Sequence, residues 1–450
     1  MNKIKIDELI SETSIMRSKD FVWGVATSSY QIEGAATLDG RLASIWDAFC
    51  EEKGRILDGS TGGVACDHYH LFEEDLDLIK SLGFSSYRFS IAWPRVVDIN
   101  GNPNELGLLF YERLIDGMLA RGIEPMLTLY HWDLPDHLQQ IGGWTNSDVQ
   151  NLFSDYAALV MERYGNRVKY WATHNEPWCS SFLSFDLGIH APGKTDRYEA
   201  MAVGKGLLMA HGKAIKKMRE INPSAQLGIV INPIVSFPHT SSERDQKAAE
   251  IHQAELNDFW FDPLNGKKPP ECLDLPNLSM SDLFKPEDLD LISQPIDFVG
   301  VNYYTRAVIE QADNIRGYEQ VNIPNVERTH IGWEVYPEGL EQLLKELQAS
   351  WPMPTWFITE NGAATDDVIV SGKCEDAQRQ RYFQTHLGAV DRAISSGVPV
   401  KGYYAWSLMD NFEWAFGYSQ RFGIVYVDYE TQERYPKGSA LAFKNFLLHG

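Results

Sequence analysis

The chain has 450 residues, of which 44% are hydrophobic and 12% are aromatic, and its formal charge at pH 7 is −22. A chain of this length buries a sizeable core, and its acidic balance argues against nucleic-acid binding, which needs a basic surface. The same balance favours a neutral or cationic ligand over a polyanion.

The N-terminal segment and the cysteines indicate where such a chain works. Asp7 and Glu8 interrupt the first ten residues, which do not resemble a signal peptide. No run of 18 apolar residues occurs, so we expect neither a membrane-spanning helix nor a membrane partner. The five cysteines are scattered and odd in number, without a C-x-x-C pair. This pattern favours a reducing compartment, so we expect a cytoplasmic protein.

Eight short runs of apolar, β-branched and aromatic residues are typical of buried parallel strands. In chain order they are Phe21–Ser28, Ser86–Ala92, Met126–Tyr130, Val168–Thr173, Gln226–Ile231, Ile296–Val301, Thr355–Thr359 and Val400–Ala405. Helical patterns lie between them, at Phe72–Leu82, Leu108–Ala120, Ser147–Tyr164, Arg197–Ile221, Pro337–Ala349 and Asp376–Ser396. This alternation predicts the α/β class and a single (β/α)8 TIM barrel over residues 1–450. Residues 1–19 are expected to be an N-terminal extension, for which mobility is an open alternative.

Polar or aromatic side chains end nearly every predicted strand, which is where a barrel of this type keeps its chemistry. They include Gln31, Arg88, His131, Trp132, Asn175, Glu176, Asn232, Asn302, Tyr303, Tyr304, Glu360, Asn361 and Trp406. One such residue is easily a hydrogen-bonded core group, and Glu176 or Glu360 alone could be a solvated loop residue. Many of them converging on one face are hard to explain by packing. Two carboxylates brought together there can cleave a glycosidic bond.

No metal or nucleotide cofactor is expected. His68 and His70 are two residues apart at the start of a helical pattern, and His131 and His137 are six apart, neither of which suits a metal site on one face. No glycine-rich phosphate loop precedes a helix.

Four segments carry a resemblance to a known family. They are Phe21–Ala35, Thr173–Pro177, Ile358–Gly362 and Trp406–Trp414. In order and spacing they resemble the motifs of glycoside hydrolase family 1, the β-glucosidase family, from about Asp20 to the C-terminus. The resemblance implies a small-molecule β-glycoside as substrate.

The resemblance also implies roles for individual residues. Glu176 would be the general acid/base and Glu360 the nucleophile, with Arg88 and Tyr304 supporting the nucleophile. The substrate-binding set would be Gln31, His131, Trp132, Asn175, Asn302, Tyr304, Trp406, Glu413, Trp414 and Phe422. Trp178 and Trp333 would line the aglycone side. For the tryptophans, ordinary core packing is the alternative, and Arg88 could be a buried ion-pair partner.

The implied reaction is a double displacement on the terminal, non-reducing β-D-glucosyl residues of β-glucosides and cello-oligosaccharides, as in cellulose degradation. We expect β-fucosides to be good substrates, β-galactosides to be weaker ones and transglycosylation to be a side activity. The two glutamates must then differ in protonation. Arg88 and Tyr304 would stabilise Glu360 as the anion, and the pKa of Glu176, close to that charge and desolvated, should rise.

Two departures from the family pattern leave the leaving-group preference open. They are Leu42–Ala43 and the stretch Ser184–Asp186, which by analogy lie near the aglycone entrance. The natural aglycone, the glucose-to-galactose ratio, glucose tolerance and oligomeric state are also left open.

Three other functions compete. A 6-phospho-β-glycosidase would carry Ser, Lys and Tyr where this chain has Glu413, Gln420 and Phe422, and a carboxylate would repel the phosphate. A sugar-binding barrel without activity usually lacks a carboxylate that this chain retains. A thioglycosidase would carry Gln at position 176.

Overall fold

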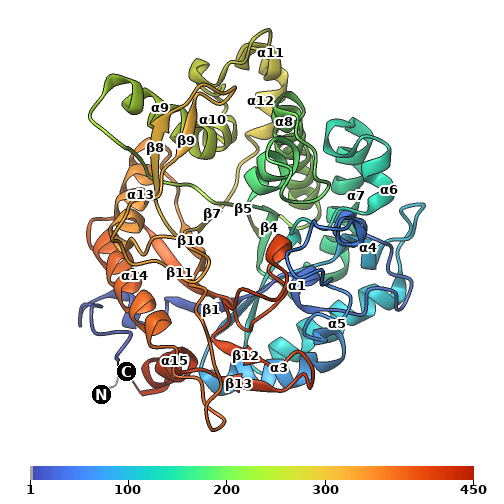
Figure 1. The fold of residues 1–450 in the computed structure, drawn as a ribbon. Coiled ribbons are helices and arrows are strands. Elements are labelled where there is room, and N and C mark those ends of the chain that lie inside the picture. Colours follow the sequence, from blue (N-terminus) through green and yellow to red (C-terminus); the bar gives the residue numbers. More distant parts are fainter. Residues whose placement is uncertain (1–3, 450) are drawn as a thin grey trace.

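A closed barrel of eight parallel strands forms the centre of the computed structural model, which describes residues 4–449 (Figure 1). The strands are β1 (Val22–Ala26), β2 (Ser86–Ser90), β3 (Glu124–Tyr130), β4 (Tyr170–Asn175), β5 (Gln226–Ile231), β7 (Phe298–Asn302), β10 (Trp356–Asn361) and β11 (Val400–Trp406). They follow one another around the barrel in chain order, and β11 closes it by pairing with β1 from Val22–Gly402 to Ala26–Trp406. The predicted (β/α)8 barrel is confirmed.

Two strands extend further than their apolar runs. The predicted strands ended at Thr173 and Thr359, whereas β4 continues to Asn175 and β10 to Asn361. Their final residues still pair with neighbouring strands, Asn175 with Val230 and Glu360 with Asn302, although the register shifts there. Polar residues can occupy these strand positions because the strands pair through main-chain hydrogen bonds, which do not require an apolar side chain. The prediction used side-chain hydrophobicity and therefore ended these strands early.

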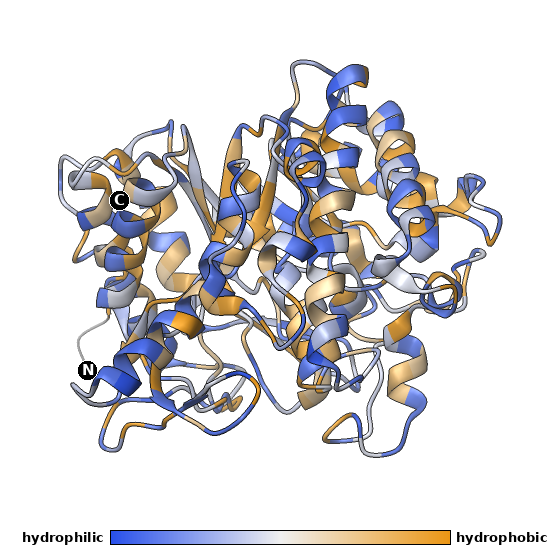
Figure 2. Ribbon diagram, turned by 90° about the horizontal axis from the view of Figure 1, so that it is seen from above, coloured by the Kyte–Doolittle hydropathy of each residue, from blue (hydrophilic) through white to orange (hydrophobic). Residues whose placement is uncertain are grey.

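Long helices surround the barrel and bury one apolar stripe each. They are α3 (His68–Leu82), α5 (Glu105–Ala120), α7 (Ser147–Tyr164), α8 (Arg197–Ile221), α13 (Pro337–Ser350), α14 (Ala377–Ser395) and α15 (Gly438–His449). In α13 the stripe is Leu340, Leu343, Leu344 and Leu347, the spacing of one helix face. Figure 2 shows this division, with hydrophobic strands in the interior and hydrophilic segments towards the outside. None of the helices described within residues 4–449 is long and apolar enough to cross a membrane.

The loops between these elements carry smaller ones. Their helices are α1 (Ser29–Ile32), α2 (Ile45–Glu51), α4 (Trp93–Val96), α6 (Asp136–Gln140), α9 (Glu243–Gln253), α10 (Phe259–Leu264), α11 (Met280–Leu283) and α12 (Pro286–Ile292), with a π-helix, η3, at Cys179–Asp186. Strands β6 (Ser236–Pro238), β8 (Ala307–Gln311) and β9 (Tyr318–Gln320) form a small sheet, and β12 (Val425–Val427) pairs with β13 (Arg434–Pro436). Figure 1 shows β8, β9 and α9 grouped outside the barrel.

Residues 4–19 pack against the barrel's outer layer. Ile6, Ile10 and Met16 are buried. The indole Nε1 of Trp23 donates to the Met16 carbonyl at 3.0 Å, and the Ser11 amide donates to Asp391 of α14 at 3.0 Å. The first three residues of the expected extension lie outside the described part of the chain.

Candidate active site

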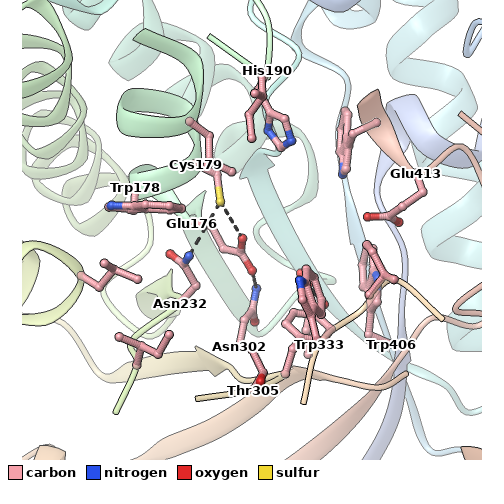
Figure 3. A pocket seen from close by; sticks show the side chains of 18 of the residues that line it. Glu176, Trp178, Cys179, His190, Asn232, Asn302, Thr305, Trp333, Trp406 and Glu413 are labelled. Atoms are coloured by element: carbon pink, nitrogen blue, oxygen red, sulfur yellow. Dashed lines mark hydrogen bonds between the residues drawn. The ribbon is translucent and has the colours of Figure 1, made fainter. Parts of the chain in front are cut away.

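A cavity of about 460 Å³ opens at the carboxyl ends of the barrel strands. The predicted site residues that line it are His131, Trp132, Glu176, Trp178, Asn302, Tyr304, Trp333, Glu360, Trp406, Glu413, Trp414 and Phe422. Gln31, Arg88 and Asn175 are fully buried, and each lies within hydrogen-bonding distance of a lining residue, Glu413, Glu360 and Asn302 respectively. The fold therefore gathers side chains from strands that are far apart in sequence around one cavity (Figure 3).

Glu360, near the end of β10, is held by a cation and a hydroxyl. Arg88 Nη1 donates to its Oε1 at 2.7 Å, in an ion pair that is almost completely buried, and the Tyr304 hydroxyl donates to its Oε2 at 2.5 Å. Burial raises the pKa of this carboxyl above its usual value, and Arg88 and Tyr304 limit that rise. Arg88 can only donate, and the Tyr304 hydroxyl donates in this arrangement, so both favour the ionised form of Glu360.

Glu176 directly follows β4 and has no cationic partner bonded to it. Asn302 Nδ2 donates to its Oε1 at 2.6 Å, and the Cys179 thiol lies 3.1 Å from its Oε2. Burial, and then the charge of Glu360, raise the pKa of Glu176 to about 7. A proton shared between the two glutamates will therefore reside on Glu176.

A chain of buried amides connects the two carboxyl groups. Asn175 Oδ1 accepts from Arg88 Nη2 at 2.5 Å and from Asn302 Nδ2 at 3.1 Å, and Asn302 Oδ1 accepts from the Thr359 hydroxyl at 2.7 Å. Asn175 Nδ2 lies 3.1 Å from His131 Nε2, which must then accept. Burial and the charge of Arg88 hold the pKa of His131 well below its usual range, so its imidazole is neutral.

Glu413 and a cluster of aromatic rings form one wall of the cavity. Trp414 lies 4.5 Å from Trp132 and stacks on His131 at 6.0 Å, and Trp406 stacks on His131 at 5.9 Å, measured between ring centroids. Gln31 Nε2 lies 3.4 Å from Glu413 Oε2. Burial, and then the charges of Glu360 and Glu176, raise the pKa of Glu413 to about 8. The sequence-based expectation treated Glu413 as a carboxylate, whereas this raised pKa favours its protonated form at neutral pH.

A network of buried charges fixes the segment that carries Glu413. Asp410 accepts from Arg421 and from Lys437, each at 2.6 Å, and Lys437 also bonds Asp367 at 2.5 Å. Lys437 is 0% exposed, so losing one partner would leave an uncompensated buried charge. This network ties the loop after β11 to the loop after β10.

The outer part of the cavity is mostly apolar. Trp178 is oriented by its Nε1, which donates to Glu255 Oε1 at 3.0 Å, and Trp333 packs on Tyr304 with 5.2 Å between ring centroids. The remaining apolar lining consists of Leu183, Leu187, Ile189, Pro233, Ile234, Leu256, Ile331 and Phe416.

The two departures noted in the sequence do not themselves line the cavity. The backbones of Leu42 and Ala43 bond to Pro94 and Asp136, in the segments of α4 and α6. Ser184 and Phe185 are buried in η3, and Asp186 pairs with Arg197 at 2.7 Å. Leu183 and Leu187, which flank Ser184–Asp186 in the sequence, do line the cavity.

The family model described as "Glycosyl hydrolase family 1" matches residues 14–449. The chain belongs to this family. It is 46% identical over 436 residues to "Beta-glucosidase A" of Acetivibrio thermocellus, covering 95% of this chain and 97% of that relative. It is 43% identical to a "1,4-beta-D-glucan glucohydrolase" of Thermotoga neapolitana, over 95% of this chain and 97% of the relative.

Solved structures agree with this membership. A family 1 β-glucosidase from Thermotoga maritima superposes with a TM-score of 0.92 at 41% identity, covering 96% of this chain and 98% of the other. The resemblance stated from the four sequence motifs is therefore confirmed, and the chain is a glycoside hydrolase.

Several cavity residues were not singled out from the sequence. They are Cys179, His190, His252, Thr305 and Gln320, together with the apolar outer lining. Asn232 was noted as a strand-end residue but received no role. Cys179 is separated from Glu176 by only two residues in the sequence, and this proximity could have indicated that it lies in the site. His190 and Thr305 lie on loops, and His252 and Gln320 lie on α9 and β9, outside the repeating strand–helix pattern, so hydrophobic periodicity does not predict where they lie.

Proposed function

We propose that this glycoside hydrolase removes terminal, non-reducing β-D-glucosyl residues by double displacement. The proposal rests on the different groups that contact the two glutamates. Glu360 has a guanidinium and a hydroxyl on its oxygens, and Glu176 has an amide and a thiol. One carboxyl is thus supported as a nucleophilic anion and the other as an acid, as retention of configuration requires.

In the first step, Glu360 attacks the anomeric carbon while Glu176 gives its proton to the glycosidic oxygen. The leaving group departs as an alcohol, and the sugar is bound to Glu360 as an ester. The negative charge on Glu360 is then gone, which lowers the pKa of Glu176 because that charge had been raising it. As a carboxylate, Glu176 takes a proton from the water that cleaves the ester. An acceptor alcohol that competes with water would give transglycosylation.

The sugar is held by the wall opposite the apolar opening. Gln31, His131, Asn175, Glu413 and Trp414 bind the hydroxyls in this proposal, and Trp406 supplies a flat ring beneath the pyranose. Glucosides and fucosides are then good substrates and galactosides weaker ones. We also place the enzyme in the cytoplasm, which is supported by five cysteines that are all free within the described residues.

A 6-phosphorylated glucoside is expected to be a poor substrate. Among the described residues, no lysine or arginine lines the cavity, so a phosphate dianion would lose its hydration without gaining a cationic partner. Protonation of Glu413 reduces the repulsion that a carboxylate would exert on the phosphate. The main reason for expecting a poor substrate is therefore that no cation is present to pair with the phosphate.

The measurement compares kcat/KM for 4-nitrophenyl β-glucoside with that for its 6-phosphate, using one enzyme preparation. We expect a preference for the unphosphorylated sugar of at least a hundredfold, about what leaving one charge unpaired costs. Preference for the phosphorylated sugar would assign the chain to the phospho-glycosidase branch instead.

Apolar leaving groups are expected to be favoured over a second sugar. The outer cavity offers more apolar side chains than hydrogen-bonding ones, and a glucosyl leaving group would have some of its hydroxyls desolvated there. We therefore expect octyl β-glucoside to have a higher kcat/KM than cellobiose, although both leaving groups are poor. A polar substitution such as Leu187→Asn should bring the kcat/KM values for octyl β-glucoside and cellobiose closer together. Cellobiose as the better substrate of the unmodified enzyme would contradict this preference.

A further inference from the structure

Cys179 is a cavity residue to which the reaction described above gives no role. It begins the π-helix η3, is 4% exposed, and lines the cavity beside Glu176. Figure 3 shows its sulfur between two polar neighbours, and the distances are 3.1 Å to Glu176 Oε2 and 3.7 Å to Asn232 Nδ2. The sulfur is held in place, because the Cys179 amide also donates to the Glu176 carbonyl at 2.9 Å.

The surrounding hydrogen bonds determine which oxygen of Glu176 can carry a proton. Arg88 can only donate, so the atom of Asn175 that faces it is the oxygen. That oxygen can only accept, so the atom of Asn302 that faces it is the nitrogen. The same nitrogen lies 2.6 Å from Glu176 Oε1, which must therefore accept. The acid proton is left to Oε2, the oxygen next to the Cys179 sulfur.

We infer that Cys179 is a positioning residue for proton transfer, whose thiol holds Oε2 of Glu176 at the place where it exchanges its proton with the substrate. The inference rests on the proposed acid/base role of Glu176. A thiol is a weak donor and a weak acceptor. It can donate to Oε2 when Glu176 is a carboxylate, and it competes little for the proton when Glu176 is an acid.

The thiol itself keeps its proton throughout the reaction. Burial, and then the charge of Glu176, raise the pKa of Cys179 well above its usual value. In the first step the proton of Oε2 passes to the glycosidic oxygen, and in the second Oε2 receives a proton from water. Between these steps the thiol hydrogen rotates towards Oε2. The sulfur forms and breaks no covalent bond, and no group is oxidised or reduced.

Other groups also act on Glu176 and have to stay unchanged in a test. The negative charge of Glu360 raises its pKa, and Arg88 lowers it. Tyr304 acts through its bond to Glu360, and Glu413 lies close enough for its pKa to respond to the charge on Glu176. Cys179 contacts the proton-bearing oxygen without bonding Glu360, so substituting it can isolate the effect.

The test compares Cys179→Ala with Cys179→Ser in kcat/KM against pH, on 4-nitrophenyl β-glucoside and octyl β-glucoside. The thiol favours the charged form of Glu176, so its loss in Cys179→Ala should move the alkaline limb to higher pH. Octyl glucoside, which needs protonation, should lose roughly threefold to tenfold in kcat/KM, the factor expected for one ordinary hydrogen bond. The nitrophenyl substrate should change less, and Cys179→Ser should restore both properties at least in part.

Cys272→Ala, at an exposed cysteine, is the matched control. It should change neither the position of the alkaline limb nor kcat/KM on either substrate. The inference would be overturned if Cys179→Ala lost kcat/KM equally on both substrates, left the alkaline limb unmoved and was not improved on by Cys179→Ser. Cys179 would then only fill space. Glu176→Ala is measured alongside. If that variant keeps the alkaline limb, the acid/base assignment fails and the inference fails with it, whereas loss of the limb there with no shift in Cys179→Ala overturns the inference alone.

Discussion

Glu360→Gly is expected to lower kcat on 4-nitrophenyl β-glucoside by several orders of magnitude, because it removes the group that attacks the anomeric carbon. Arg88 and the Tyr304 hydroxyl would then face an open space where the carboxylate had been. Added azide can enter that space and attack from the same side. Activity should return in proportion to azide, and the product should be the α-glucosyl azide, which NMR identifies.

Glu413→Gly is a suitable control for this rescue. It removes another carboxyl group from the same cavity and should weaken sugar binding, but azide should not restore its rate. A β-glucosyl azide from Glu360→Gly would overturn the assignment of Glu360 as nucleophile, since it requires attack from the opposite side.

Glu176→Ala is expected to affect poor leaving groups far more than good ones. An alkyl glucoside should lose on the order of 10²–10⁴-fold in kcat/KM, the usual range for general acid catalysis, while an activated aryl glucoside that needs little protonation should lose much less. Activity of the unmodified enzyme should fall as the pH rises through the pKa of Glu176, about 7, because only the protonated form is an acid. That alkaline limb should disappear in the variant.

Glu176→Gln separates the acid role from packing. Its side-chain oxygen can still accept from Asn302, but it has no acidic proton to give. It should therefore resemble Glu176→Ala in its dependence on the leaving group. Equal loss for all leaving groups, with the alkaline limb intact, would mean that another residue is the acid.

The sequence predicted the barrel well because each central strand is buried on both faces, so its apolar run is unbroken. It placed the ends of β4 and β10 too early, because their last residues are polar and are paired by main-chain bonds. The small sheet β6–β8–β9 and helices α9–α12 were not predicted. These elements are short and lie outside the repeating strand–helix pattern.

For the site, the sequence located the carboxyl groups but could not give their surroundings. Arg88 and Glu360 are 272 positions apart, and their 2.7 Å contact depends on closure of the barrel. The orientation of Asn302 depends on Asn175, and that of Asn175 on Arg88. The protonation of Glu413 likewise follows from its burial close to two other carboxyl groups, which no local motif records.

Whether Glu360 forms a covalent bond to the sugar can be measured with an activated 2-deoxy-2-fluoro-β-glucoside. The fluorine slows both steps, and the good leaving group restores the first, so the glycosyl-enzyme accumulates. Mass spectrometry of the intact protein should show one added fluoroglucosyl group, and peptide mapping should place it on Glu360. A label on Glu176 or on any other residue, or inactivation without a label, would mean that Glu360 is not the nucleophile.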